Sequence, residues 1–334
     1  MVFRIRKRLF AVTILVILFF AIIGKSLWKY EGYTISKHFD FSRKQLIIAT
    51  PYDIGGACHP KIVYFENGFN NYKYWMAYTP YQNHNSRYEN PCILASNDLD
   101  IWEVPKGLKN PCLDDLYNNK DKRIYNSDTH ILFNNDTNQI ECWWRYVNDK
   151  DNYVKIYRRV SQNGEYWHPK EVVRTLKNRK KLDYVSLSVL YNNKKYKIYY
   201  VNKNRIWMTS SNDLQTYSEP VLVNVDFENK IKPWHIDVEK TSNGYEMVFV
   251  AYPKNQKHHF NMNLYYCKSE DGYNWSKPIV ILKPRKYKSW DDGGIYRSAL
   301  LKVDDVYHVI YTGWSKVGKV GLGHVQGVDI RSLK

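Results

Sequence analysis

A short motif recurs four times along this chain of 334 residues and constrains its fold more than any other feature. Each copy has a serine, an aspartate or asparagine two positions later, and an aromatic residue six positions after the serine. The copies are Ser96–Trp102, Ser161–Trp167, Ser211–Tyr217 and Ser269–Trp275. Because aspartate and glycine form turns and a serine hydroxyl can bind nearby backbone groups, the motif predicts a corner between two strands. The aromatic residues are 65, 50 and 58 residues apart, a period typical of propeller blades.

Strand-like segments flank the motif in the same order each time, and they define five repeating units. Inner strands are expected at 59–65, 128–133, 186–191, 235–239 and 297–301, each followed by an aromatic-rich second strand. The fifth unit lacks the corner motif, and 321–325 would be its third strand. The pattern predicts an all-β fold, a five-bladed β-propeller of four-stranded antiparallel blades over residues 45–334. The chain near 45–49 would complete the edge of the last blade.

The N-terminus has the pattern of an export signal. Basic residues over 4–8 precede the apolar run Leu9–Ile23, and no small-residue cleavage site follows. We therefore expect residues 1–30 to form a cytoplasmic stub and a signal-anchor helix through the cell membrane, and 31–44 a linker. The propeller would lie outside the cytoplasm. Secretion after cleavage of the signal is the alternative.

The formal net charge is +17, which favours anionic partners such as acidic polysaccharide. An abundance of lysine and asparagine typical of AT-rich genomes explains the charge equally well. A nucleic-acid partner is not expected for an exported protein. None of the five cysteines forms a CxxC pair, so a zinc knuckle is not expected, and the cysteines could form one or two disulfides. No cofactor or metal is predicted.

Polar and ionisable residues lie where each apolar inner strand begins. In a propeller these positions converge on one central funnel, so the sequence predicts a ligand site there. Residues expected to contact the ligand from the wall and rim of the funnel are His59, Tyr81, His130, Arg145, Tyr184, Ser186, His235, Tyr296, Arg297 and Trp314.

The five units, the corner motifs and the start His59-Pro60 resemble the five-bladed propeller glycoside hydrolases, families 43 and 32 and their relatives. Residues 72–81, 88–91 and 234–238 are also similar to a group of bacterial and phage propellers usually called glycosidase-like. The resemblance implies three funnel carboxylates, one each from the first three blades. Asp128 matches the second, whereas His59 replaces the first. The segment Tyr184–Ser188 offers no third-blade glutamate.

Glycoside hydrolysis requires two carboxyls flanking the bond, one protonated and one ionised. Here we expect Asp237 to act with Asp128 or Glu89. The pair His235 and Asp237, with His59 and His130, could serve as an acid–base set, ligate a metal or support a sugar by hydrogen bonds, and the metal is the least favoured because the spacing shows no compact ligand motif. The predicted function is a membrane-anchored glycosidase acting on a surface or extracellular polysaccharide, neutral or acidic. The alternatives are a carbohydrate-binding propeller without catalysis and an accessory protein of polysaccharide assembly or export.

Overall fold

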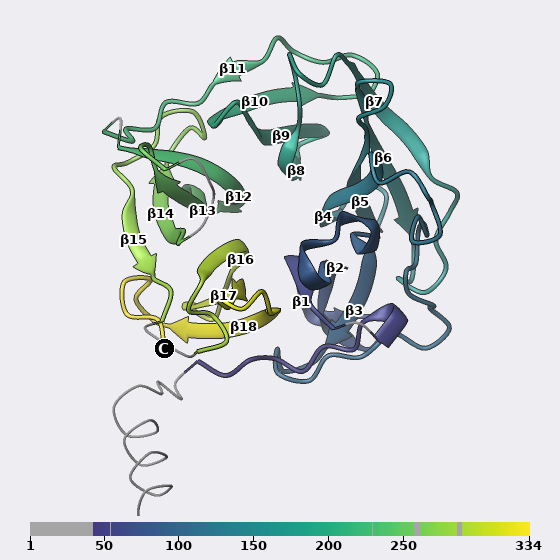
Figure 1. The fold of residues 1–334 in the computed structure, drawn as a ribbon, viewed down its shortest axis with the longest axis horizontal. Coiled ribbons are helices and arrows are strands. Elements are labelled where there is room, and N and C mark those ends of the chain that lie inside the picture. The colour runs from purple at the N-terminus through teal and green to yellow at the C-terminus, as the bar shows by residue number, and fades with distance from the viewer. Residues whose placement is uncertain (1–42, 54, 229, 257–260, 286–288) are drawn as a thin grey trace, which may run out of the picture. The chain divides into compact units, whose positions relative to one another are not determined.

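The computed structural model describes residues 43–53, 55–228, 230–256, 261–285 and 289–334. The described residues from 43 onward form five antiparallel sheets arranged in a ring, as Figure 1 shows. The first blade contains β1 (Ala57–Phe69), β2 (Tyr72–Pro80) and β3 (Cys92–Ser96). The second contains β4 (Ile124–Asn134), β5 (Gln139–Asn148), β6 (Tyr153–Ser161) and β7 (Glu171–Lys177). The third contains β8 (Val185–Asn192), β9 (Lys195–Asn202), β10 (Arg205–Ser211) and β11 (Val221–Leu222). The fourth contains β12 (Ile231–Thr241), β13 (Gly244–Pro253), β14 (Asn263–Ser269) and β15 (Ile279–Leu282). The fifth contains β16 (Gly294–Val303), β17 (Val306–Trp314) and β18 (Val320–Gly327).

The predicted five-bladed propeller is therefore confirmed, with each inner strand at the predicted residues. Two blades are completed by single bridges in place of a full fourth strand. Glu103 bridges Ala95 in the first blade, and Gln45 bridges Gly323 in the fifth. The second bridge joins the start of the described body to its last blade, as expected, because closing the ring leaves no open seam between first and last blades.

Apolar residues fill the interfaces between blades. Trp75 and Ile93 of the first blade share a buried cluster with Ile131 and Trp144 of the second. The residues that alternate with these along the same strands face the blade on the other side. Both faces of each blade are therefore rich in aromatic and β-branched residues.

The four corner motifs form the turns that the sequence predicts. In the first copy, the Ser96 hydroxyl accepts hydrogen bonds from the backbone N–H groups of Asp98 and Leu99. The Asp98 carboxylate accepts from the next two N–H groups, and the Trp102 indole donates to the Leu99 carbonyl at 2.9 Å. The motif is thus a self-contained structural corner, and in the first four blades it lies at the end opposite to the start of the inner strand.

Every inner strand carries an irregularity close to its start. Pairing with the second strand shifts between Cys58 and Lys61 in β1, and at the equivalent place in the other four inner strands. Within the shift His59, Asp128 and Ser186 have positive φ angles of 55°, 54° and 53°. Such bulges change the direction of a side chain, so residues here need not follow the simple alternation of a strand.

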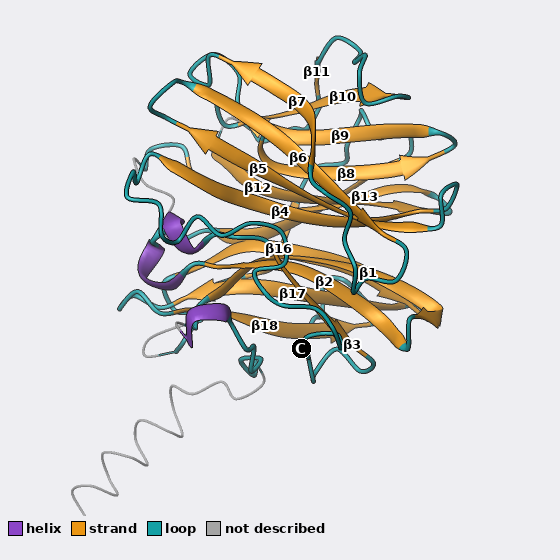
Figure 2. Ribbon diagram, turned by 90° about the vertical axis from the view of Figure 1, so that its right-hand side faces the viewer, coloured by secondary structure: helices purple, strands orange, loops and turns teal. Residues whose placement is uncertain are grey.

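Three short 3-10 helices, η1 (Pro51–Asp53), η2 (Gln82–His84) and η3 (Ser86–Tyr88), lie on one face of the ring, as Figure 2 shows. The loop that carries η2 and η3 connects the second and third strands of the first blade, so this is the face where the inner strands begin. Within the described part of the chain no helix has the length and apolarity needed to cross a membrane. The expected anchor at 1–30 lies outside the described residues.

Candidate functional site

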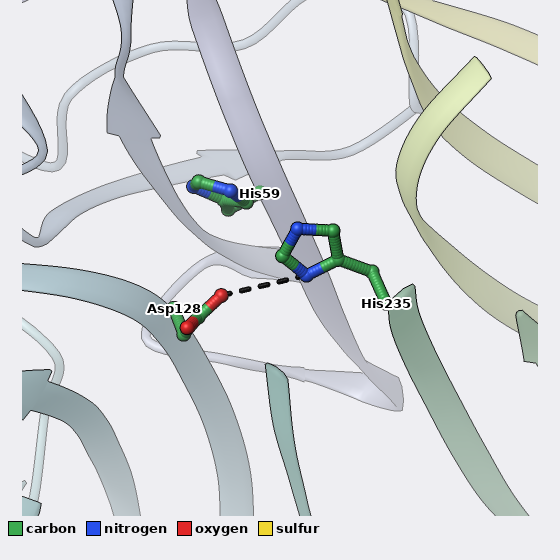
Figure 3. A group of neighbouring side chains, drawn as sticks. All are labelled: His59, Asp128 and His235. Carbon is green, nitrogen blue, oxygen red and sulfur yellow. Dashed lines mark ion pairs between the residues drawn. The ribbon is translucent and has the colours of Figure 1, made fainter. Parts of the chain in front are cut away.

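Three buried side chains converge near the axis of the propeller, as Figure 3 shows: His59 from β1, Asp128 from β4 and His235 from β12. One ligand atom from each lies within 4.8 Å of those of the other two, and the three residues are 2%, 1% and 3% exposed. His235 Nδ1 lies 3.5 Å from Asp128 Oδ1. We call these three residues the axial cluster. Two of them lie in the strand bulges, which explains how residues from three blades point at one place.

Asp128 is held as a carboxylate. Burial by itself would raise its pKa, but Arg145, followed by His235, His59 and Arg297, lowers the pKa well below its usual value. Arg145 Nη1 lies 2.7 Å from Asp128 Oδ2, and Arg297 Nη1 lies 3.7 Å from Oδ1. Oδ1 itself accepts no hydrogen bond from any described residue.

His59 is held as a neutral imidazole. Burial lowers its pKa to about 3, against the opposing effect of Asp128, and the nearby Arg297 and Arg145 lower it further. Its Nδ1 is 2.8 Å from the Thr79 hydroxyl. Its Nε2 is buried and has no hydrogen-bond partner among the described residues. A neutral imidazole with a free nitrogen beside a carboxylate is the donor set that divalent transition metals prefer, so the axial cluster could hold a metal ion.

Glu89 is a second buried acid near the axial cluster, and its pKa is shifted in the direction opposite to that of Asp128. It is 5% exposed, and its carboxylate lies 3.6 Å from His59 Nδ1. Burial and then the charge of Asp128 raise its pKa well above the usual value, although Arg145 and Ser127 oppose this. Burial and the neighbouring charges together therefore shift the pKa of Glu89 upward and that of Asp128 downward.

Arg145 is fixed by residues that the sequence did not single out. Its Nε and Nη2 donate to the two oxygens of Asp183 at 2.8 and 3.0 Å. Asp183 also accepts from Arg179 Nε at 2.8 Å. This bidentate pair aims the remaining nitrogen of Arg145 at Asp128. The sequence signal that could have identified Asp183 is its place as an acid shortly before the third inner strand.

Asp237, the first predicted catalytic acid, lies deeper along the axis than the axial cluster. Lys61 Nζ lies 2.8 Å from Asp237 Oδ1, and the Leu300 N–H donates to Oδ2 at 3.0 Å. Lys61 also pairs with Glu239. Asp237 thus joins strands of three blades, and nothing in the structure tests its predicted role. Sequence reasoning missed Lys61, a 3% exposed lysine inside an apolar inner strand.

Three other predicted ligand-binding residues contact neighbouring blades. The Ser186 hydroxyl accepts from the Ile236 N–H at 2.9 Å, and His130 Nε2 accepts from the Val189 N–H at 3.1 Å. The Tyr184 ring stacks on Tyr200 at 3.8 Å in the core between the second and third blades. The structure does not bring these three side chains into the axial cluster.

The aromatic residues predicted to contact the ligand lie close to the axial cluster. The Tyr296 ring lies 4.3 Å from that of His235 and stacks on Trp314 at 4.8 Å, and the Tyr81 ring lies 5.9 Å from that of His59. These rings form a wall beside the axial cluster.

No family model matches the chain. One curated relative is the A type blood N-acetyl-α-D-galactosamine deacetylase of Flavonifractor plautii, 28% identical over 291 residues. The match covers 72% of this chain but 37% of that protein, so the chain spans little more than a third of its length.

Solved structures confirm the fold. A crystal structure of an N-acetylgalactosamine deacetylase from F. plautii, with blood group B trisaccharide, superposes with a TM-score of 0.76 at 21% identity, covering 85% of this chain and 94% of that one. An α-L-arabinofuranosidase from Podospora anserina gives 0.58 at 11% identity, covering 84% and 94%. One from Fusarium graminearum gives 0.55 at 13% identity, covering 86% and 97%. The chain is a five-bladed β-propeller similar in structure to glycoside hydrolases and to a sugar deacetylase of the same fold.

Proposed function

We propose that this protein is a carbohydrate N-deacetylase, which hydrolyses the acetamido group of an N-acetylated sugar within a larger glycan. The observation that carries the proposal is the axial cluster. Two imidazoles and an ionised carboxylate face one another within 4.8 Å, and His59 Nε2 and Asp128 Oδ1 are buried without hydrogen-bond partners among the described residues. Leaving buried polar atoms unpaired is costly, so such atoms indicate a missing ligand.

The donor set fits a divalent cation held by His59, Asp128 and His235. Such an ion would supply polarisation of the amide carbonyl and a more acidic bound water. The remaining contribution comes from the chain itself. Arg145 and Arg297 keep Asp128 ionised, and burial keeps His59 neutral, so both are in the protonation state that ligation requires.

Glu89 is the group we assign to proton transfer. Hydrolysis adds hydroxide to the carbonyl carbon, breaks the C–N bond and leaves acetate and an amine, whose nitrogen must gain a proton. Glu89, next to His59, can supply that proton from its acid form, which its raised pKa favours.

Similarity to the F. plautii deacetylase supports the amide as the bond that is cleaved. Its TM-score of 0.76 exceeds the 0.55 and 0.58 of the two arabinofuranosidases. The expected location, anchored at the cell membrane with the propeller outside, would place a surface or extracellular polysaccharide within reach.

A second candidate function is glycoside hydrolysis, and one observation favours it. Glu89 and Asp128 are two buried acids whose pKa values are shifted in opposite directions, which favours the one protonated and one ionised carboxyl that a glycosidase needs. In that case Glu89 would be the acid and Asp128 the base or nucleophile.

One experiment separates the two functions. The full-length protein in detergent is incubated with N-acetylated oligosaccharides, and both free acetate and new reducing ends are measured. We expect acetate without reducing ends, loss of acetate release on chelation, and recovery with added divalent metal. Asp128→Asn and Glu89→Gln should each lower the rate at least about a hundredfold. Asp305→Asn, an exposed acid on a turn between strands, should not.

Reducing ends that depend on Asp128 and Glu89 would transfer the assignment to glycosidase. Binding of the glycans with neither product would leave the binding-module alternative and refute both enzymatic functions.

A further inference from the structure

A cavity of about 280 Å³ lies at the rim of the propeller, on the side of the fifth blade. Its walls come from three separate parts of the chain: His84 of η2, Asn261 before β14, and the turn from Trp314 to Gly318 after β17. We call it the rim cavity. Its volume is close to the lower limit for small-ligand sites, which suits a single sugar residue.

Aromatic rings connect the rim cavity to the axial cluster by two routes. On one route Trp314 stacks on Tyr296 at 4.8 Å, and Tyr296 meets His235 at 4.3 Å. On the other, His84 meets Tyr81 at 5.6 Å, and Tyr81 meets His59 at 5.9 Å. Each route crosses one intervening ring, so the rim cavity is no further from the cluster than two ring-to-ring contacts. A ligand occupying both places would be at least a disaccharide.

The turn that forms the outer wall is firmly held. The backbone N–H of Ser315 donates to the Lys319 carbonyl, and the N–H of Gly318 donates to the Ser315 carbonyl at 2.9 Å. Gly293 allows the close approach of this turn, because a Cβ there would lie 2.8 Å from the Ser315 carbonyl carbon. The cavity is therefore preformed, and a ligand would not have to order it.

The turn also presents a cation. Lys316 lines the cavity and is exposed, and its ammonium makes no hydrogen bond or ion pair with the described residues. Its backbone N–H donates to Asp292 Oδ1 at 2.9 Å, so this nearby acid is engaged by the turn and is 7% exposed. Burial lowers the pKa of His84, which leaves Lys316 as the charged group among the described residues that line the cavity.

We infer that the rim cavity binds the sugar next to the reacting one and selects a sugar that carries a carboxylate, through the ammonium of Lys316 and the rings of Trp314 and His84. This inference rests on the proposed function in one respect only, namely that the sugar at the axial cluster is the one that reacts. A flexible lysine suits this task because it can reach an anionic group as a point charge while the aromatic rings fix the sugar plane.

The test uses paired probes that differ only in charge. A hyaluronan tetrasaccharide alternates an N-acetylated sugar with a uronic acid, and its carboxyl-reduced form is the neutral partner. Binding of each to the full-length protein is measured by calorimetry at low and at physiological salt. We expect the acidic probe to bind about tenfold more tightly at low salt, and the difference to shrink as salt rises.

Lys316→Ala should remove that difference without weakening binding of the neutral probe, Lys316→Glu should reverse it, and Lys316→Arg should retain most of it. Lys319→Ala is the matched control, since Lys319 is an exposed lysine of the same turn that does not line the cavity. Equal affinity for the two probes, absence of binding by either, or an equal effect of Lys319→Ala would overturn the inference.

Acetate release, measured in parallel, keeps the two proposals distinct. Charge-selective binding that depends on Lys316 without acetate release would sustain the rim cavity and refute the deacetylase. Acetate release from the acidic probe that does not change when Lys316 is replaced would sustain the deacetylase and refute the rim cavity.

Discussion

Asp128 and Asp237 show how environment decides what one residue type does. Both are buried aspartates on inner strands. Asp128 lies among Arg145, Arg297 and two imidazoles, and its Oδ1 has no hydrogen-bond partner among the described residues, whereas Asp237 is enclosed by Lys61 and a backbone N–H. Asp128 therefore has a lone pair available for a ligand, whereas the carboxylate of Asp237 is used to join blades.

A pair of histidines away from the axial cluster makes a prediction at the same scale. His308 Nδ1 and His324 Nε2 lie 3.1 Å apart on the fifth blade, so the pair can share one proton but not hold two. Burial, and then His324, lowers the pKa of His308 to about 4. Between pH 6.5 and about 4 the unfolded chain binds a proton here that the folded chain excludes, so stability falls as the pH falls.

We expect this pair to cost about 1 kcal/mol of unfolding free energy between pH 7 and pH 5, after allowance for solvent screening. Urea unfolding of the wild type and of His308→Gln at several pH values measures it, and the gap between the two curves should change with pH. Replacement of the exposed His168 by glutamine is the control. Parallel curves for wild type and His308→Gln would contradict the prediction.

At the scale of elements, the corners hold the blades in register through one left-handed residue each. The position three after the serine has φ of 68° at Leu99, 74° at Gly164, 58° at Leu214 and 77° at Gly272. Two copies tolerate leucine, so the backbone conformation alone does not require glycine. At Gly164 the neighbouring blade does, because a Cβ would lie 2.2 Å from the ring of Trp75.

Gly164→Ala should therefore destabilise the protein by roughly 2–4 kcal/mol, through the clash with a fully buried indole as well as the backbone strain. Gly318→Ala isolates the strain, since its φ is +85° and nothing lies within 4 Å of the added carbon. That control should cost about 1 kcal/mol. Equal losses in urea unfolding would show that the indole yields, contrary to expectation.

At the scale of the whole molecule, the ring is closed by a short segment at the start of the described body. The Leu46 N–H donates to the Leu322 carbonyl at 2.8 Å, and the Leu46 side chain packs in a cluster that includes residues of both the first and fifth blades. Opening this seam would expose the edge of the last blade and the cluster shared with the first, so its contacts should stabilise the entire ring.

Leu46→Ala is expected to lower the unfolding free energy by roughly 2–4 kcal/mol, the usual cost of a buried leucine. Ile47→Ala changes the next residue, which is 87% exposed, and should have little effect. A thermal or urea unfolding curve measures both. If the two variants were equally stable, the segment would not be the closure of the ring.

The propeller itself could be predicted from the sequence because its signal is periodic. Four corner motifs and five apolar inner strands repeat at a blade-sized interval, and each repeat needs only local information: turn chemistry, strand propensity and alternation. The same periodicity placed the closing segment near residue 45, since the fifth unit lacked an edge strand. His59, Asp128 and His235 could be named as funnel residues for the same reason, as each begins a predicted inner strand.

What those residues do together was decided by the tertiary structure alone. The bulges at His59 and Asp128 turn their side chains towards His235, and Ser186, in a similar bulge, bonds to the next blade. Lys61 and Asp183 become partners of Asp237 and Arg145 across distances in sequence of 176 and 38 residues. Burial then raises the pKa of Glu89 and lowers that of His59. Sequence patterns encode elements because elements are local, whereas a site depends on which charges share one buried volume, and only the folded ring determines that.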